Sequence, residues 1–249
     1  MFRSSLARFL AGALLCGLMA SGSALCADAP AEDTVVGSSE CRYQPGPQDS
    51  PETAQALALF GAKYQAVAQS AKYLSHKMLL EPYHKRQREI FCLTADEIQA
   101  EIVDLRQDGP GRLVHLKIRY VVDISDFVRA EIKNTELESR EANFSWDQEM
   151  EQRLSPAVRP GEELSRAYRY LRKKQRRVAI IYLDHLLKKY PNWGDAYLAR
   201  AIGYYTMNDR RNMLADLRTA CDLFNQEACE DLAALEDQRH PDDRLQPQP

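Results

Sequence analysis

A repeat of 34 residues in the C-terminal part of the chain restricts the fold more than any other feature. The pair Arg176-Arg177 recurs 34 positions later as Arg210-Arg211. The same offset aligns apolar or aromatic residues along the whole unit: Leu164 with Leu198, Ala167 with Ala201, Tyr170 with Tyr204, Leu183 with Leu217, and Tyr190 with Phe224. A period of this length with helical spacing predicts paired helices that bury their apolar faces against neighbouring pairs.

The repeat resembles the tetratricopeptide family over residues 160–227. Small residues permit close helix approach at Ala167, Ala179, Ala201 and Ala220, and Pro191 ends the second helix of the first unit. The segment departs from the family's pattern at Glu163, Arg166, Arg200 and Met213. The resemblance implies an all-α tetratricopeptide-like helical array, which with its last helix covers residues 161–239, followed by a disordered tail over 240–249.

The N-terminus has the layout of a secretory signal peptide. Arg3 and Arg8 precede an apolar run from Phe9 to Ala20, and small residues follow over 21–24. The run is too short to span a bilayer. We therefore predict a signal peptide over 1–27, cleaved after Ala27 or after Cys26, and a periplasmic or secreted protein. A lipid anchor on Cys26 is not expected, because Ser23 and Leu25 reverse the order that such a signal requires.

Four cysteines remain after removal of residues 1–27: Cys41, Cys92, Cys221 and Cys229. In an exported chain they predict two disulfides, with three possible connectivities. The residues around Cys221 and Cys229 (ACDL, then EAC) resemble the cysteine-paired variant of the Sel1-like repeat of secreted bacterial proteins. This resemblance implies a Cys221–Cys229 bridge that joins a capping helix to the array, which leaves Cys41 and Cys92 as the second pair.

A different pattern precedes the repeat. Residues 28–50 are rich in Pro, Gly, Ser and Asp and predict a flexible segment with a short strand around Val35–Tyr43. Ser50 and Pro51 begin an Ala-rich helix, which Pro82 limits. Apolar residues then alternate on both sides of the turn at 108–111, which predicts a β-hairpin. We expect a small α+β domain of a helix packed on a sheet over 51–133, then a charged, partly helical connector over 134–160.

The N-terminal domain has a fainter resemblance over residues 40–133. An early strand, the helix AQALALFGAKYQAVAQSAKYL and a hairpin that ends RLVHLKIRYVVDISDFVRAEI are similar to the N-terminal domain of flagellar assembly protein T and related envelope lipoproteins. The rest of that flagellar protein has no counterpart in this chain. The resemblance therefore implies a fold and not a flagellar role.

Two surfaces of the helical array are candidate binding sites. In tetratricopeptide pairs the first helix of each unit lines the inner face, which here gives a candidate peptide-binding set of Tyr168, Arg172, Asp195, Ile202 and Tyr205. The alternative is that this face packs on the protein's own first domain. The segment 166–177 holds seven basic residues, of which six form a candidate contact with anionic lipid or cell-wall polymer: Arg166, Arg169, Lys173, Lys174, Arg176 and Arg177. The alternative there is a solvated helix face.

The rest of the sequence argues against catalysis and nucleic-acid binding. The 33 Lys+Arg and 36 Asp+Glu give a net charge of −3, whereas nucleic-acid binders are usually basic. We find no Ser-x-x-Lys, GxSxG, P-loop or GxGxxG motif and no metal-ligand spacing. The sequence thus predicts an exported, non-catalytic envelope adaptor without a cofactor or metal, which binds a protein or peptide. Association with a membrane or cell-wall surface is the alternative, and a hydrolase is less favoured.

Overall fold

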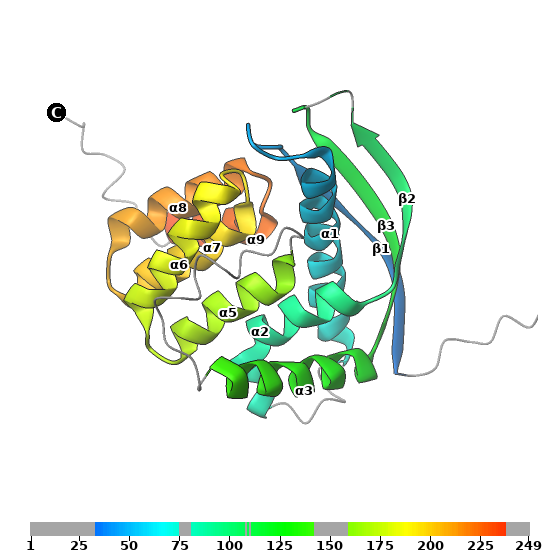
Figure 1. Ribbon diagram of the computed structural model, residues 1–249, viewed down its shortest axis with the longest axis horizontal. Coiled ribbons are helices and arrows are strands. Elements are labelled where there is room, and N and C mark those ends of the chain that lie inside the picture. Colours follow the sequence, from blue (N-terminus) through cyan, green and yellow to red (C-terminus); the bar gives the residue numbers. More distant parts are fainter. Residues whose placement is uncertain (1–32, 75–80, 108, 110, 142–158, 238–249) are drawn as a thin grey trace, which may run out of the picture.

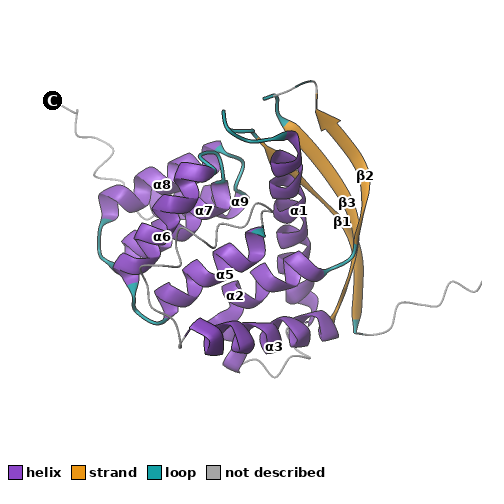
Figure 2. Ribbon diagram, viewed as in Figure 1, coloured by secondary structure: helices purple, strands orange, loops and turns teal. Residues whose placement is uncertain are grey.

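The computed structural model describes residues 33–74, 81–107, 109, 111–141 and 159–237. It is an α+β structure in which a three-stranded sheet lies on one side of a group of helices (Figures 1 and 2). The predicted signal peptide, the segment 28–32, most of the connector and the predicted tail lie outside the described residues. The elements that precede the connector are β1 Thr34–Tyr43, α1 Pro51–Leu74, α2 Glu81–Glu97, β2 Ala100–Gln107, β3 Val114–Asp123 and α3 Ile124–Glu141.

The sheet has the strand order β1-β3-β2, with both pairings antiparallel. The strand expected around Val35–Tyr43 is present as β1, and the expected hairpin is β2 and β3. Alternate residues of β3 are buried: Val114, Leu116, Ile118, Tyr120 and Val122. This alternation gives the sheet one apolar face, which packs against α1.

Helix α1 fits closely against the sheet because its sequence is rich in alanine. The Ser50 hydroxyl accepts a hydrogen bond from the Thr53 backbone N–H at 3.2 Å and so caps the first turn. At Gly61 the helix approaches β1 so closely that an added Cβ would lie 2.6 Å from the Cys41 Sγ. The small residues of α1 therefore set the distance between the helix and the sheet.

Helix α2 is an element that the sequence patterns did not predict. Its first half is charged, and Pro82 indicates a break, but the proline occupies the second position of the helix, where it costs no hydrogen bond. The second half is apolar and buried, with Ile90, Cys92 and Leu93 all almost inaccessible. Helix α2 packs against α1, α3 and α5 (Pro160–Arg172) and thus joins the two predicted parts of the chain.

Five consecutive helices form the C-terminal part: α5, α6 Arg176–Lys189, α7 Gly194–Thr206, α8 Arg210–Asp222 and α9 Gln226–Asp237. Each packs on the next. The 34-residue period is visible in the backbone, because Lys174 and Asn208 occupy equivalent turns with φ of 61° and 60°. Phe224 has φ of 67° in the turn that precedes α9.

The buried apolar residues form one large cluster and one small cluster. One cluster extends from the sheet and α1 through α2 and α5 to α6 and α7. Trp193, which is 1% exposed, packs edge-on against Phe60 of α1 with 6.3 Å between ring centroids. A second, smaller cluster lies among α7, α8 and α9. The first part of the chain and the first repeat therefore share a core.

The structure confirms one of the two predicted disulfides. Cys221 and Cys229 form a bridge that links the end of α8 to α9. The Cys41–Cys92 pair is wrong, because both residues are free thiols. Cys41 lies on β1 against α1, and Cys92 lies on α2, which packs on a different side of α1. The two thiols thus belong to elements that each pack on α1, and spacing along the chain does not reveal how far apart they lie.

Candidate functional site

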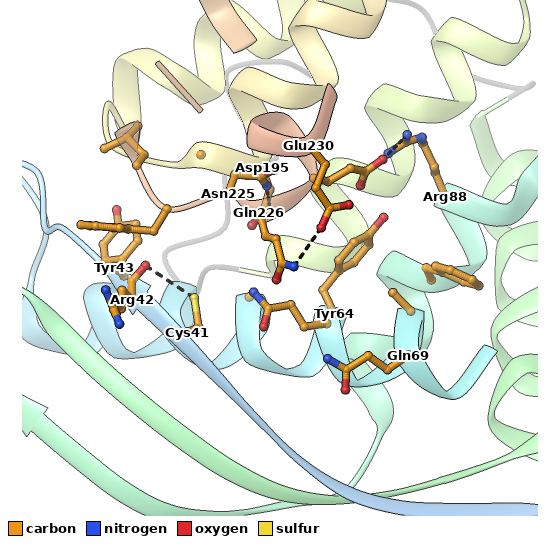
Figure 3. A pocket seen from close by; sticks show the side chains of 18 of the residues that line it. Cys41, Arg42, Tyr43, Tyr64, Gln69, Arg88, Asp195, Asn225, Gln226 and Glu230 are labelled. Carbon is orange, nitrogen blue, oxygen red and sulfur yellow. Dashed lines mark hydrogen bonds and ion pairs between the residues drawn. The ribbon is translucent and has the colours of Figure 1, made fainter. Parts of the chain in front are cut away.

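A pocket of about 700 Å³ lies where α1 and α2 face the turns of the helical array (Figure 3). Its walls come from the end of β1, from α1 and α2, from the turn between α6 and α7, and from the turn between α8 and α9 with the start of α9. Aromatic residues contribute much of the wall: Tyr43, Tyr64, Phe91, Trp193 and Phe224. Amide side chains also line it: Gln65, Gln69, Gln87, Asn225 and Gln226.

Asp195, in the first turn of α7, is one of three acidic groups that line the pocket; the others are Glu227 and Glu230 of α9. The Asp195 carboxylate accepts hydrogen bonds from the Trp193 indole N–H at 3.2 Å and from the Asn225 amide at 2.7 Å. Burial raises the pKa of Asp195 from 3.8 to about 6, because removal from water disfavours the charged form. The group is therefore mostly ionised at pH 7 and mostly neutral at pH 5.

Arg88 and Glu227 bridge another part of the pocket wall. Arg88 of α2 forms an ion pair with Glu227 of α9, and its guanidinium lies 5.6 Å from the centre of the Tyr168 ring. The pair connects residues that are 139 positions apart in the sequence. It holds α9 against α2, and so it fixes one side of the pocket.

The pocket chemistry suits binding better than nucleophilic catalysis. Burial raises the pKa of the Cys41 thiol to about 12, so the reactive thiolate is scarce at neutral pH. Burial also holds the pKa of Tyr43 and of Tyr64 well above the usual value for tyrosine. Among the described residues, no group of three His, Cys, Asp or Glu side chains is placed to hold a metal ion.

Of the five predicted peptide contacts, Asp195 lines this pocket and the other four do not. Tyr168 of α5 is buried, and the Arg88 guanidinium of α2 lies over its ring. Ile202 packs against the core. Arg172 donates to the Glu89 carboxylate at 2.6 Å. Tyr205 is 70% exposed at the far end of α7. The face of α5 is thus covered by the protein's own α2, as in the alternative that we considered, and Tyr168 and Arg172 are not available to a peptide.

The predicted basic surface is also smaller than the sequence indicates. Arg169 is fully buried; it donates to the Asn134 side-chain oxygen at 3.0 Å and lies 3.8 Å from Glu89. Arg169 is therefore not part of the exposed surface. Arg166 lies beside the Tyr182 hydroxyl, and Lys173 forms an ion pair with Glu138 at 3.1 Å.

Four residues of the basic set remain exposed: Lys173, Lys174, Arg176 and Arg177. They lie in the turn between α5 and α6 and in the first turn of α6. Of the other three basic residues in the segment, Arg169 and Arg172 lie against Glu89 of α2, and Arg166 contacts Glu163 and Tyr182.

The sequence patterns missed the main wall of the pocket. Gln65, Gln69 and Lys72 of α1 line it, and they are spaced so that they fall on one face of the helix. This polar stripe on an otherwise Ala-rich helix was the signal that could have placed a binding surface there. Arg88 and Phe91 were missed because α2 itself was not predicted.

Comparison with models of protein families, with curated proteins and with solved structures finds no match to this chain. In the described part of the chain, none of the helices combines the length and the apolar character that a membrane span needs. The case for a function therefore rests on the pocket and on the residues that line it.

Proposed function

We propose that this protein is a non-catalytic adaptor of the bacterial envelope that holds a segment of a partner polypeptide in the pocket between α1 and α9. The combination of aromatic and amide side chains on the pocket wall carries this proposal. Tyrosine and tryptophan supply apolar contact area at low entropic cost, and they are enriched at binding hot spots. Amides can pair with both the N–H and the C=O groups of a peptide backbone.

The size of the pocket supports a ligand of several residues, because about 700 Å³ falls in the range of ligand sites in proteins. The Cys221–Cys229 bridge supports an exported protein, since disulfides persist in oxidising compartments. The predicted signal peptide agrees with this location. Periplasmic or secreted localisation is therefore part of the proposal.

In this proposal α5–α9 are a short tetratricopeptide/Sel1-like array. The equivalent turns at Lys174 and Asn208 and the disulfide before the last helix support this assignment. Helix α2 covers the face of α5, so the peptide-binding surface is displaced toward the start of α7 and α9. Asp195 and Gln226 lie on that surface.

The proposal is tested by selection of a phage-displayed heptapeptide library on the full mature protein, followed by affinity measurements on two variants. Gln65→Trp fills the pocket from α1, whereas Gln55→Trp places the same ring on an exposed position of the same helix, outside the pocket. We expect selected peptides to bind Gln55→Trp as the unchanged protein does and to bind Gln65→Trp at least about tenfold more weakly. Failure to select any peptide, or equal binding to both variants, would show the proposal to be wrong.

A second candidate function is association with an anionic surface, which the exposed Lys174, Arg176 and Arg177 favour. Sedimentation with phosphatidylglycerol vesicles tests it. Binding at 20 mM salt that disappears by about 300 mM, and that is lost when all three residues are changed to Gln, is the expected result, because exposed charges are screened by salt. An absence of binding at low salt would exclude this function.

A further inference from the structure

The most buried acids of the described residues each pair with an arginine, whereas the half-buried Asp195 has no cationic partner. Glu89 pairs with Arg172, Asp126 with Arg129, and Asp216 with Arg200. Within the described residues, no lysine or arginine nitrogen lies within 4 Å of the Asp195 carboxylate.

The two hydrogen bonds to Asp195 come from neutral donors, the Trp193 indole and the Asn225 amide. The charged neighbour that affects its titration is Glu227, which carries the same sign. A buried carboxylate without a positive partner is unfavourable, because the surroundings replace little of the water that it has lost.

Asp195 also faces a cavity, whereas the paired acids Glu89, Asp126 and Asp216 do not line it. It lines the pocket together with the rings of Tyr43 and Trp193 (Figure 3). The side chain is half-buried, so a group that enters the pocket can reach it. Aromatic rings beside a carboxylate provide favourable surroundings for a desolvated cation. In the pocket, a carboxylate thus lies beside open space and aromatic walls, and this combination suits a positively charged group.

We propose that the pocket recognises a primary ammonium group of the bound peptide, either a lysine side chain or a free amino terminus, with Asp195 as its counter-charge. This inference rests on the proposed function and adds the chemical class of the ligand. An ammonium group fits the remaining lone pairs of the carboxylate, because it presents three N–H donors in a compact head. Its arrival supplies the positive partner that the protein itself does not place there.

The inference requires that binding depends on pH. The titratable groups around Asp195 are Cys41 and Tyr43 of β1, Cys92 of α2, Tyr168 of α5 and Glu227 of α9. Burial raises the pKa of each of these thiols and phenols above its usual value, so they stay neutral between pH 5 and pH 7. Glu227 is paired with Arg88. Protonation of Asp195, with a pKa of about 6, therefore weakens ammonium binding about tenfold between pH 7 and pH 5.

Three synthetic hexapeptide pools separate the sources of the ammonium group. All contain random Ala, Gly, Gln, Leu, Ser and Tyr around one fixed position. The first pool is acetylated and carries a fixed lysine; the second is acetylated and carries norleucine; the third carries norleucine and a free amino terminus. We expect the full mature protein at pH 7 to retain the first or the third pool about tenfold more than the second, as measured by affinity-selection mass spectrometry.

Two carboxylate variants identify the group that supplies the charge. Asp195→Asn is expected to abolish the preference for the ammonium pools. Asp222→Asn is the matched control, because it makes the same change at an exposed position outside the pocket, and the preference is expected to persist. Preference that survives in Asp195→Asn would overturn the inference. If that variant does not fold, the pH series on the unchanged protein decides, and a preference that is the same at pH 5 and pH 7 overturns the inference.

The outcomes also separate this inference from the proposed function. If the unchanged protein retains the three pools equally, and the Gln65→Trp variant retains none of them, the pocket binds peptides but the ammonium inference is wrong. If the protein retains none of the pools, both are wrong. A preference for the lysine pool alone identifies an internal lysine, and a preference for the third pool alone identifies an amino terminus.

Discussion

The Glu89 carboxylate, buried where α2, α3 and α5 meet, provides the sharpest test of how the protein is held together. It is 1% exposed and accepts hydrogen bonds from Arg172 at 2.6 Å and from the Asn134 amide at 3.0 Å. It also lies 3.8 Å from Arg169, which is itself buried. Glu89→Gln keeps the size of the side chain and removes its charge, so two arginines lose this negative partner at once.

The expected loss is large because the partners stay buried. Removal of one member of a buried ion pair typically costs about 3–5 kcal/mol, since the remaining charge is left uncompensated. For a protein of this size, each kcal/mol corresponds to a change in melting temperature of about 2–4 °C. We therefore expect Glu89→Gln to lower the melting temperature by about 6–20 °C.

Glu138→Gln is the matched control for this experiment. Glu138 also pairs with Arg172, at 3.2 Å, but its side chain is 24% exposed. Pairs of this kind contribute about 0–1 kcal/mol. Urea unfolding at pH 7 measures both variants, and calorimetry gives the melting temperatures. Equal losses below about 1 kcal/mol in both variants would refute the reasoning, because the buried network would then add nothing beyond a surface ion pair.

Three further predictions concern other parts of the fold. Replacement of Cys221 and Cys229 by serine is expected to cost about 2.5 kcal/mol by the loop-entropy relation, as measured by urea unfolding; no change would show that the bridge does not stabilise the end of the array. Gly161→Ala places a Cβ 2.2 Å from the Cys92 carbonyl oxygen, so we expect a loss of about 1–3 kcal/mol in thermal unfolding, and an unchanged melting temperature would contradict the packing of α5 on α2. Because burial raises the pKa of Asp195 from 3.8 to about 6, the folded state binds more protons than the unfolded state in that range, so its contribution to stability is present below pH 4 and is lost as the pH rises through 6. Asp195→Asn should therefore become more stable relative to the unchanged protein, by up to about 3 kcal/mol, between pH 4 and pH 7.5; equal pH dependence of the two urea midpoints would contradict this.

The elements that the sequence predicted are those with local signals. The Ser50 cap and the Ala-rich spacing mark α1, and alternating residues around a Gly-containing turn mark β2 and β3. The equivalent turns at Lys174 and Asn208 follow from the 34-residue period. In each case the residues that determine the structure lie within a few positions of one another, or recur at a fixed distance, so one sequence is enough to identify them.

The candidate site was less predictable because distant segments build it. The burial of Arg169 depends on Glu89, eighty positions earlier in the chain, and the basic segment alone gives no sign of that partner. Tyr168 is covered by α2, which the sequence patterns did not predict. Asp195 was a candidate from the sequence and lines the pocket, but the opposite wall, with Gln65 and Gln69, comes from a part of the chain that was interpreted only as core.

The contacts of α2 with the last helices also bear on the order in which the protein folds. A chain is synthesised from its N-terminus, so Arg88 emerges 139 residues before its partner Glu227. Until α5 follows, the apolar face of α2 has no partner from the array, and exposed apolar surface of this kind favours aggregation. Contacts between residues that are so far apart in the sequence also form slowly. Folding intermediates that contain only the sheet and the first helices should therefore expose apolar surface and be the species most prone to aggregation.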